Sequence, residues 1–201
     1  MRTRALLGAM VALMTLSALA VAQEKAAPPA DPQMQAMMQL MEKFGTPGPE
    51  HQRLLKGVGT WDVVSKMWMD PAREPTVSKG TQVQRAILGG RYIQYDLEGD
   101  MAGMPFSGFG ITGYDRYNKK VVSLWLDSMG TGFYLTEGSC DEAGQVCTET
   151  GSWDDYMTGK KMNVRDVVRH LDDDHFTMEM YTGGPDGKDV KMMEATYTRR
   201  K

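Results

Sequence analysis

The chain has 201 residues, of which 23 are Lys or Arg and 26 are Asp or Glu, and its formal net charge is −3 at pH 7. A protein that tracks nucleic-acid phosphates needs a basic stripe, whereas the cations here are scattered among acids, so nucleic acid is excluded as a partner. A single domain of this length can bury a substantial core.

The first segment has the pattern of an export signal. Arg2 and Arg4 form a basic start, residues 5–19 form an apolar run, and Ala20-Val21-Ala22 is a small-x-small cleavage site. We therefore assign residues 1–22 to a signal peptide and expect an exported protein, either periplasmic or secreted. No later apolar run approaches the about 20 residues that span a bilayer, so no stable membrane span is expected.

A short helix should follow the signal. Residues 23–33 are rich in Pro and Ala and are assigned to a linker. Four methionines then recur at the spacing of one helix face, at Met34, Met37, Met38 and Met41. Gly and Pro at residues 45–49 should end this helix before one or two further helical turns. We assign residues 34–56 to this Met-rich helix and connection, and residues 57–201 to a β-barrel domain.

From residue 58 onward, β-prone runs alternate with turn residues at intervals of roughly ten residues, which is typical of an all-β sandwich or barrel. The turns are too short for a crossover helix, so parallel pairing is disfavoured. About ten runs are predicted, at residues 61–69, 80–88, 92–98, 106–114, 120–127, 132–138, 145–150, 161–171, 175–182 and 190–199.

Two residue pairs indicate how the sheet is held together. Trp61 in the first run and Arg199 in the last become neighbours if the sheet closes, and the guanidinium can then cover the indole at a gain of roughly 0.5–2 kcal/mol. Cys140 and Cys147 flank a turn-like segment, and in an oxidising compartment they should form a disulfide across a hairpin. The predicted fold is therefore all-β, an antiparallel barrel of about ten strands with a short N-terminal helix.

Several segments together resemble the DUF1579 family of bacterial proteins of unknown function. They include residues 51–70, 88–92, 103–106, 108–115, 125–127, 129–132 and 157–161. The resemblance covers roughly residues 45–200 and implies a lipocalin-like (calycin) barrel without an established activity. It supplies no catalytic residue, and the cysteine pair and the export signal depart from the family's pattern.

Three motifs suggest chemistry that their context does not favour. Residues 108–113 match Gly-x-Gly-x-x-Gly, but a turn and another strand follow in place of the helix that a dinucleotide requires, so Gly108 and Gly110 more simply admit a close approach. His170 and His175 flank three aspartates and could hold a metal, but three adjacent aspartates make a good hairpin tip, so a solvated acidic turn is the favoured explanation. The 18 methionines suggest Cu(I), but their spacing favours packing. No metal site and no cofactor are assigned.

The sequence contains no Gly-x-Ser-x-Gly nucleophile elbow, and no catalytic residue is assigned. The leading hypothesis is non-catalytic binding of a small, partly apolar ligand inside the barrel, because a pocket with a few polar groups orients such ligands. The alternative is an envelope protein-interaction or stress-protection module without a small ligand, and an enzyme is the third possibility. The oligomeric state is not predicted. The candidate ligand-binding residues are Arg85, Arg91, Tyr92, Tyr95, Trp125, Asp127 and Arg165.

Overall fold

The computed structural model describes residues 31–156, 158–184 and 188–201, so the predicted signal peptide and most of the predicted linker lie outside the described residues. The ten strands are β1 (Gly59–Met67), β2 (Thr76–Ile87), β3 (Tyr92–Met101), β4 (Met104–Asp115), β5 (Lys120–Asp127), β6 (Tyr134–Cys140), β7 (Val146–Asp155), β8 (Lys160–His170), β9 (His175–Gly183) and β10 (Asp189–Arg199).

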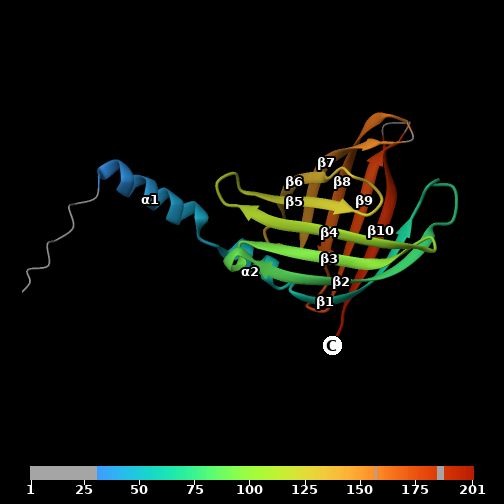
Figure 1. The fold of residues 1–201 in the computed structure, drawn as a ribbon, viewed down its shortest axis with the longest axis horizontal. Helices are drawn as coiled ribbons and strands as arrows, with labels where there is room; N and C mark the ends of the chain where they lie inside the picture. Colours follow the sequence, from blue (N-terminus) through green and yellow to red (C-terminus); the bar gives the residue numbers. More distant parts are fainter. Residues whose placement is uncertain (1–30, 157, 185–187) are drawn as a thin grey trace, which may run out of the picture.

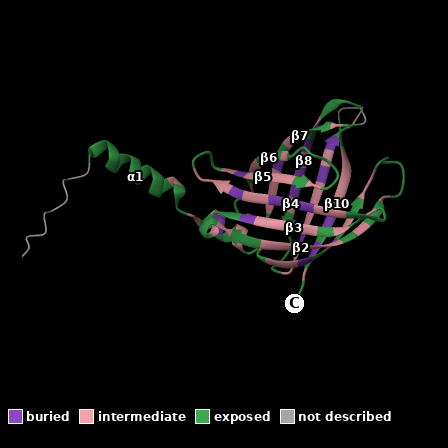
Figure 2. Cartoon of the chain, in the orientation of Figure 1, coloured by how far each residue is buried: buried purple, intermediate pink, exposed green. Residues whose placement is uncertain are grey.

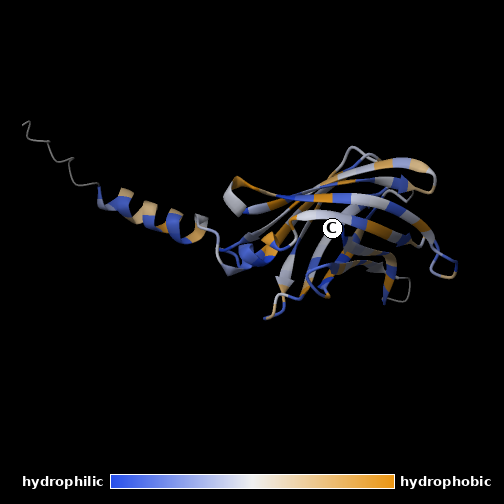
Figure 3. Ribbon diagram, turned by 90° about the horizontal axis from the view of Figure 1, so that it is seen from below, coloured by the Kyte–Doolittle hydropathy of each residue, from blue (hydrophilic) through white to orange (hydrophobic). Residues whose placement is uncertain are grey.

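These strands form a closed barrel in which each strand pairs with its sequence neighbours in antiparallel fashion and β1 pairs with β10 (Figure 1). The predicted fold is confirmed. Short turns join the strands because Gly, Asp and Asn occupy the connections. Hydrophobic and hydrophilic residues alternate along the strands, as Figure 3 shows, so that one face of the sheet lines the interior and the other meets solvent.

Two helices precede the barrel within the described residues. Helix α1 (Pro32–Gly45) begins at Asp31, whose side chain accepts a hydrogen bond from the backbone N–H of Gln33. Helix α2 (Pro49–Leu55) follows after a short break. The described helices include none that is both long and apolar enough to cross a membrane.

Helix α1 extends away from the barrel and is exposed except at Phe44, whose ring meets that of Tyr117 edge-on with centroids 5.1 Å apart (Figures 1 and 2). Its C-terminal end is held by Arg116, which donates hydrogen bonds to the carbonyl oxygens of Lys43 at 2.6 Å and Thr46 at 2.7 Å. The methionine face predicted from the sequence therefore meets solvent, with Met41 65% exposed. Helix α1 therefore covers neither end of the barrel.

The barrel is closed by contacts around Arg199. Trp61 and Arg199 are partners in the β1–β10 register, and the guanidinium lies 4.2 Å from the indole ring centre. Arg199 also donates hydrogen bonds to the carbonyl oxygens of Lys56, Val58 and Asp173, at 2.7, 2.8 and 2.9 Å respectively. The Arg199 side chain thus connects the last strand of the barrel to the segment that precedes the first strand. It also satisfies backbone carbonyl groups that form no hydrogen bond within the sheet.

The hydrophobic core occupies the end of the barrel nearest α2. Trp61, Val63 and Ala195 pack there with Phe176 and Tyr197. The Phe176 and Tyr197 rings are stacked with centroids 4.1 Å apart, and Trp61 meets Phe176 edge-on at 4.7 Å. Because this cluster gathers at one end, it leaves the rest of the interior for other side chains.

The Cys140–Cys147 disulfide is present, as predicted. The two cysteines are partners in the β6–β7 register, where the hairpin closes next to α2. The bond therefore fastens the β6–β7 turn at the end of the barrel that also holds the core.

Candidate functional site: the barrel interior

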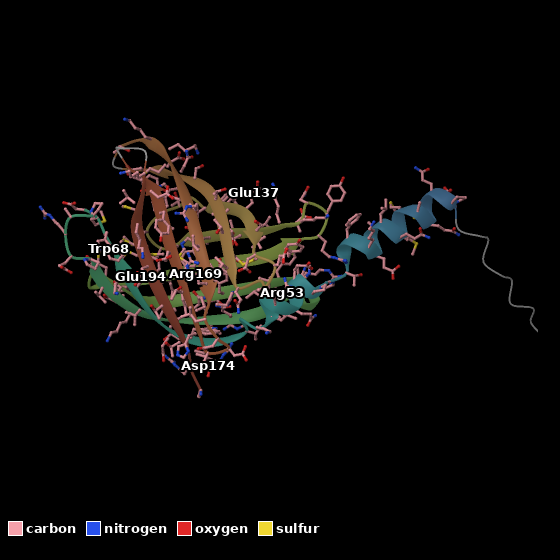
Figure 4. All side chains as sticks on the ribbon, turned by 180° about the vertical axis from the view of Figure 1, so that it is seen from behind. Arg53, Trp68, Glu137, Arg169, Asp174 and Glu194 are labelled. Atoms are coloured by element: carbon pink, nitrogen blue, oxygen red, sulfur yellow. A yellow bond between two sulfur atoms is a disulfide. The ribbon has the colours of Figure 1, made fainter. Side chains whose placement is uncertain are left out.

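A cavity of about 1630 Å³ occupies the barrel interior. Helix α2 covers part of one end, where Arg53 lies against Gly144 of the β6–β7 turn and Leu55 lies against Gly90. Figure 4 shows Arg53 at that end and Trp68 at the opposite one. The cavity wall at the opposite end includes exposed apolar side chains of the loops, namely Met69, Met129, Phe133 and Tyr156.

An aromatic wall lines one side of the cavity. The rings of Tyr95 on β3 and Trp125 on β5 are stacked with centroids 5.9 Å apart and lie across the intervening strand β4. They fit because β4 carries glycine beneath them. A Cβ on Gly110 would lie 2.1 Å from the Tyr95 ring, and one on Gly108 would lie 2.2 Å from the Trp125 ring. The Gly-x-Gly motif of this chain therefore accommodates aromatic rings.

Polar groups run along the same wall. Tyr95 and Thr112 share a hydrogen bond at 3.4 Å, and Thr112 and Ser123 share another at 2.8 Å. Trp125 donates its indole N–H to Asp127 at 2.9 Å. Burial raises the pKa of Tyr95 to about 12, so its hydroxyl remains a neutral donor and acceptor at physiological pH.

Two carboxyl groups lie side by side in the middle of the barrel wall. Glu149 on β7 and Asp166 on β8 are partners in the strand register, so both side chains point to the same face, and Glu149 lines the cavity. Each residue is only 7% exposed. Thr136 donates a hydrogen bond to Glu149 Oε2 at 2.7 Å, and the Tyr134 hydroxyl donates to Asp166 Oδ2 at 2.9 Å.

Neither carboxyl group of this pair has a cationic partner among the described residues. Among the described residues, Asp166 Oδ1 is a buried side-chain atom without a hydrogen-bond partner, and no salt bridge reaches either carboxyl. Burial raises the pKa of Asp166 to about 7, and the neighbouring Glu149 charge acts in the same direction against the Tyr134 hydrogen bond. Near neutral pH the Asp166 carboxyl can therefore retain its proton.

The structure brings three of the seven candidate ligand-binding residues to the cavity: Tyr95, Trp125 and Asp127. Arg85 and Arg165 lie on the outer face of the barrel, where they pair with Asp96 and Asp189. The reason is strand alternation, because a residue beside an inward-facing one points outward.

The other two candidates lie near α2. Arg91 donates a hydrogen bond to the Leu88 carbonyl oxygen at 3.1 Å. Tyr92 lies over Gly113, where a Cβ would meet its ring at 2.4 Å. Neither side chain belongs to the cavity wall among the described residues.

Sequence reasoning missed the carboxyl pair and its hydroxyl donors Tyr134 and Thr136. The usable signal was an acidic residue at an inward position in each of two strands joined by a hairpin. Recognising it requires the register of β7 against β8, which a one-residue shift would reverse.

The histidines do not converge on one another. His170 packs against Phe176 with ring centroids 5.7 Å apart, and His175 Nδ1 hydrogen bonds to the Asp172 carboxylate at 2.9 Å. His51 is buried and accepts a hydrogen bond from the Gly48 N–H at 3.0 Å. The part of the chain that the structure describes contains no group of three or more His, Cys, Asp or Glu residues that could hold a metal ion.

Comparison with solved structures shows what this barrel resembles. Rv2717c from M. tuberculosis has 16% sequence identity and a TM-score of 0.58, with the match covering 78% of this chain and 100% of that one. A structure described as EF1p2_mFAP2b bound to DFHBI has 12% sequence identity and a TM-score of 0.41, with the match covering 75% of this chain and 99% of that one. At these identities the likeness to Rv2717c shows the fold alone.

Comparison of sequences gives the family. No curated protein is similar enough to count as a match. A family model described as "Protein of unknown function (DUF1579)" matches residues 46–199, which include α2, every strand of the barrel and the aromatic and acidic cavity walls. The chain therefore belongs to the DUF1579 family.

Proposed function

We propose that this protein binds a small, partly apolar molecule inside the barrel without transforming it. The observation that carries the proposal is the cavity of about 1630 Å³ with stacked aromatic rings in its wall. Pockets that hold small ligands typically measure about 300–1,000 Å³ and are lined mostly by apolar and aromatic groups with a few polar ones. This cavity has both the space and the chemistry for such a ligand.

The apolar rim supports the same proposal. Met69, Phe133 and Tyr156 are 74%, 67% and 77% exposed and belong to the cavity wall at the end opposite α2. An apolar molecule that enters there exchanges water for side chains and gains about 25 cal/mol per Å² of apolar surface buried. A module that only bound other proteins would need no such hollow interior, so the cavity favours a small ligand over the interaction alternative.

A second candidate function is acid–base catalysis on a bound molecule. The observation that favours it is the carboxyl pair, because a carboxyl group whose pKa is about 7 can accept or donate a proton at neutral pH. Turnover of the bound molecule, and its loss in Asp166→Asn, would distinguish catalysis from binding.

The binding proposal is tested with the solvatochromic dye Nile red. Ser65 lines the cavity and Val64 is its outward-facing neighbour on β1, so Ser65→Trp fills the interior while Val64→Trp is a matched control. We expect saturable fluorescence enhancement in the wild-type protein and in Val64→Trp, and at least about tenfold weaker binding in Ser65→Trp. Ser78→Trp, in register with Ser65, provides a second filled cavity.

Thermal unfolding of each variant verifies that it is folded. Absence of dye binding in the wild-type protein, together with native mass spectra free of any adduct in protein from its own cells, would overturn the proposal. Equal dye binding by both filled variants and the control would overturn it as well.

We also propose that the protein works outside the cytoplasm. The signal-like residues 1–22 motivate this, and the Cys140–Cys147 disulfide supports it because disulfides persist in oxidising compartments. Mass spectrometry of protein from separated cell fractions should find a chain beginning at Gln23 outside the cytoplasm. An intact residue 1–22 segment on cytoplasmic protein would contradict the proposal.

A further inference from the structure

We propose that the bound molecule is an organic cation, with its protonated nitrogen held by Glu149 and Asp166 and its apolar body lying along the aromatic wall of the cavity. This inference rests on the proposed binding function and adds the chemical class of the ligand. It comes from Glu149 and Asp166, the buried carboxyl groups among the described residues, whose side-chain hydrogen-bond donors there are the hydroxyl groups of Thr136 and Tyr134.

The first argument is an unsatisfied acceptor. Asp166 is only 7% exposed, and its Oδ1 atom has no hydrogen-bond partner among the described residues. A buried acceptor left without a donor destabilises the folded protein, and a charged one does so more strongly. An ammonium nitrogen carries up to three N–H donors, so it can satisfy Oδ1 and still reach Glu149 on the adjacent strand.

The second argument is the distribution of charge between the two faces of the barrel. On the outer face, cations are paired with acids: Arg85 with Asp96, Arg165 with Asp189, and Lys191 with both Glu179 and Glu194. On the inner face, Glu149, which lines the cavity, and its register partner Asp166 receive hydrogen bonds from Thr136 and Tyr134, which are neutral. Buried carboxylates are ordinarily paired with a cation, and here the ligand would supply it.

The third argument concerns which cation fits. A metal ion needs more ligands than two carboxyl groups, and the described residues contain no cluster of three or more His, Cys, Asp or Glu residues. Aromatic rings favour an organic cation instead. The Tyr134 ring, whose hydroxyl contacts Asp166, lies 6.1 Å from the Trp153 ring, and both rings line the cavity. A cation near an aromatic face is attracted by the ring quadrupole, and more strongly where water is excluded.

Protonation adds a consequence that can be measured. Because burial and the Glu149 charge raise the pKa of Asp166 to about 7, the empty site holds a proton that an arriving cation must displace. Tyr95 and Tyr197 also face these carboxyl groups, and burial raises their pKa values, so they stay neutral. Affinity for a cation should therefore rise between about pH 6 and pH 8, with release of a proton.

The test uses three naphthalene probes that differ only in their polar group: 1-naphthylmethylamine, 1-naphthalenemethanol and 1-naphthoic acid. Calorimetric titration is done at about pH 8, where Asp166 is mostly ionised and the amine is still protonated. We expect the amine to bind at least about tenfold more tightly than the alcohol, and the acid to bind most weakly.

The variants Glu149→Gln and Asp166→Asn should each weaken amine binding about tenfold and leave alcohol binding within about twofold. Glu137→Gln is the matched control, because it removes an exposed carboxylate of β6 that pairs with Lys120 on the outer face. It should leave the binding of all three probes unchanged. Nile red binding reports whether each variant retains its cavity.

Failure of this inference is distinguishable from failure of the proposed function. Three results would overturn the cation inference alone. They are equal binding of the amine and the alcohol, an amine preference that survives in both Glu149→Gln and Asp166→Asn, and binding of Nile red but of no naphthalene probe. Absence of binding for Nile red and for all three probes would overturn the proposed function as well.

Discussion

Replacing Asp166 by Asn should change the pH dependence of stability more than any other single substitution of a buried carboxyl group in the barrel. The pKa of this carboxyl is raised from 3.8 to about 7, principally by burial. A difference of about 3 units between the folded and unfolded states corresponds to roughly 4 kcal/mol at 1.36 kcal/mol per unit. Asn has a similar shape and can still accept the Tyr134 hydrogen bond, so the change isolates the charge.

The sign follows from proton binding. The folded protein binds this proton more tightly than the unfolded chain does, so the stabilisation is fully present below about pH 4 and is lost as the pH rises through 7. Asp166→Asn has no charge to bury, and it should therefore match the wild-type protein near pH 4 and exceed it by up to about 4 kcal/mol at pH 8. Glu179 and Glu194 have lowered pKa values, so their ionised forms stabilise the folded protein. That stabilisation is lost only as the solution becomes acidic, and it does not change between about pH 5 and pH 8.

The assay is urea unfolding at intervals between about pH 5 and pH 8, with Glu137→Gln as the control for loss of an exposed carboxylate. The free energy of unfolding of the wild-type protein and of the control should fall across this range relative to that of Asp166→Asn. The lowered pKa values of His51 and His170 raise stability with pH equally in all three proteins, so the difference between profiles isolates Asp166. Parallel pH profiles for Asp166→Asn and the wild-type protein would refute the reasoning, because the buried carboxyl would then not titrate in this range.

Three further substitutions test the architecture. Gly110→Ala should cost about 1–3 kcal/mol in chemical unfolding, because its Cβ would overlap the facing tyrosine ring, whereas Gly183→Ala, with nothing within 4 Å, should be nearly neutral; equal effects would contradict the packing account. The double change Cys140→Ser and Cys147→Ser should cost about 2.5 kcal/mol from the short closed loop, and thermal unfolding with and without reductant checks it. An unchanged unfolding temperature in the double variant would count against that estimate. Arg199→Lys should cost about 1–3 kcal/mol, since Lys cannot bind three carbonyls while covering an indole, and an unaltered unfolding midpoint would disprove this role.

Local sequence patterns determined the strands of this protein. The run at residues 120–127 was predicted with the bounds that β5 has in the structure, because a turn rich in Asp and Asn precedes it and Ser128 follows it. The Met-rich helix was predicted from its spacing, and α1 has that face on the side exposed to solvent. Such features depend on residues close together in the chain.

The phase of each strand was the main limit on predicting the site. Tyr95, Trp125 and Asp127 line the cavity as the alternation suggested, whereas Arg85 and Arg165 point outward. A shift of one residue along the strand changes an inward-pointing side chain into an outward-pointing one. The sequence pattern does not determine which residues point inward where polar residues occur on both faces of the strand.

By itself the sequence determined the closed barrel of about ten strands, the disulfide and the residues available for a site, since turn chemistry and alternation act locally. Only the tertiary structure decided that the interior is hollow and that Glu149 meets Asp166 within it. Those two properties depend on how strands that are distant along the chain come into register, and on how far the aromatic core fills the closed barrel from one end.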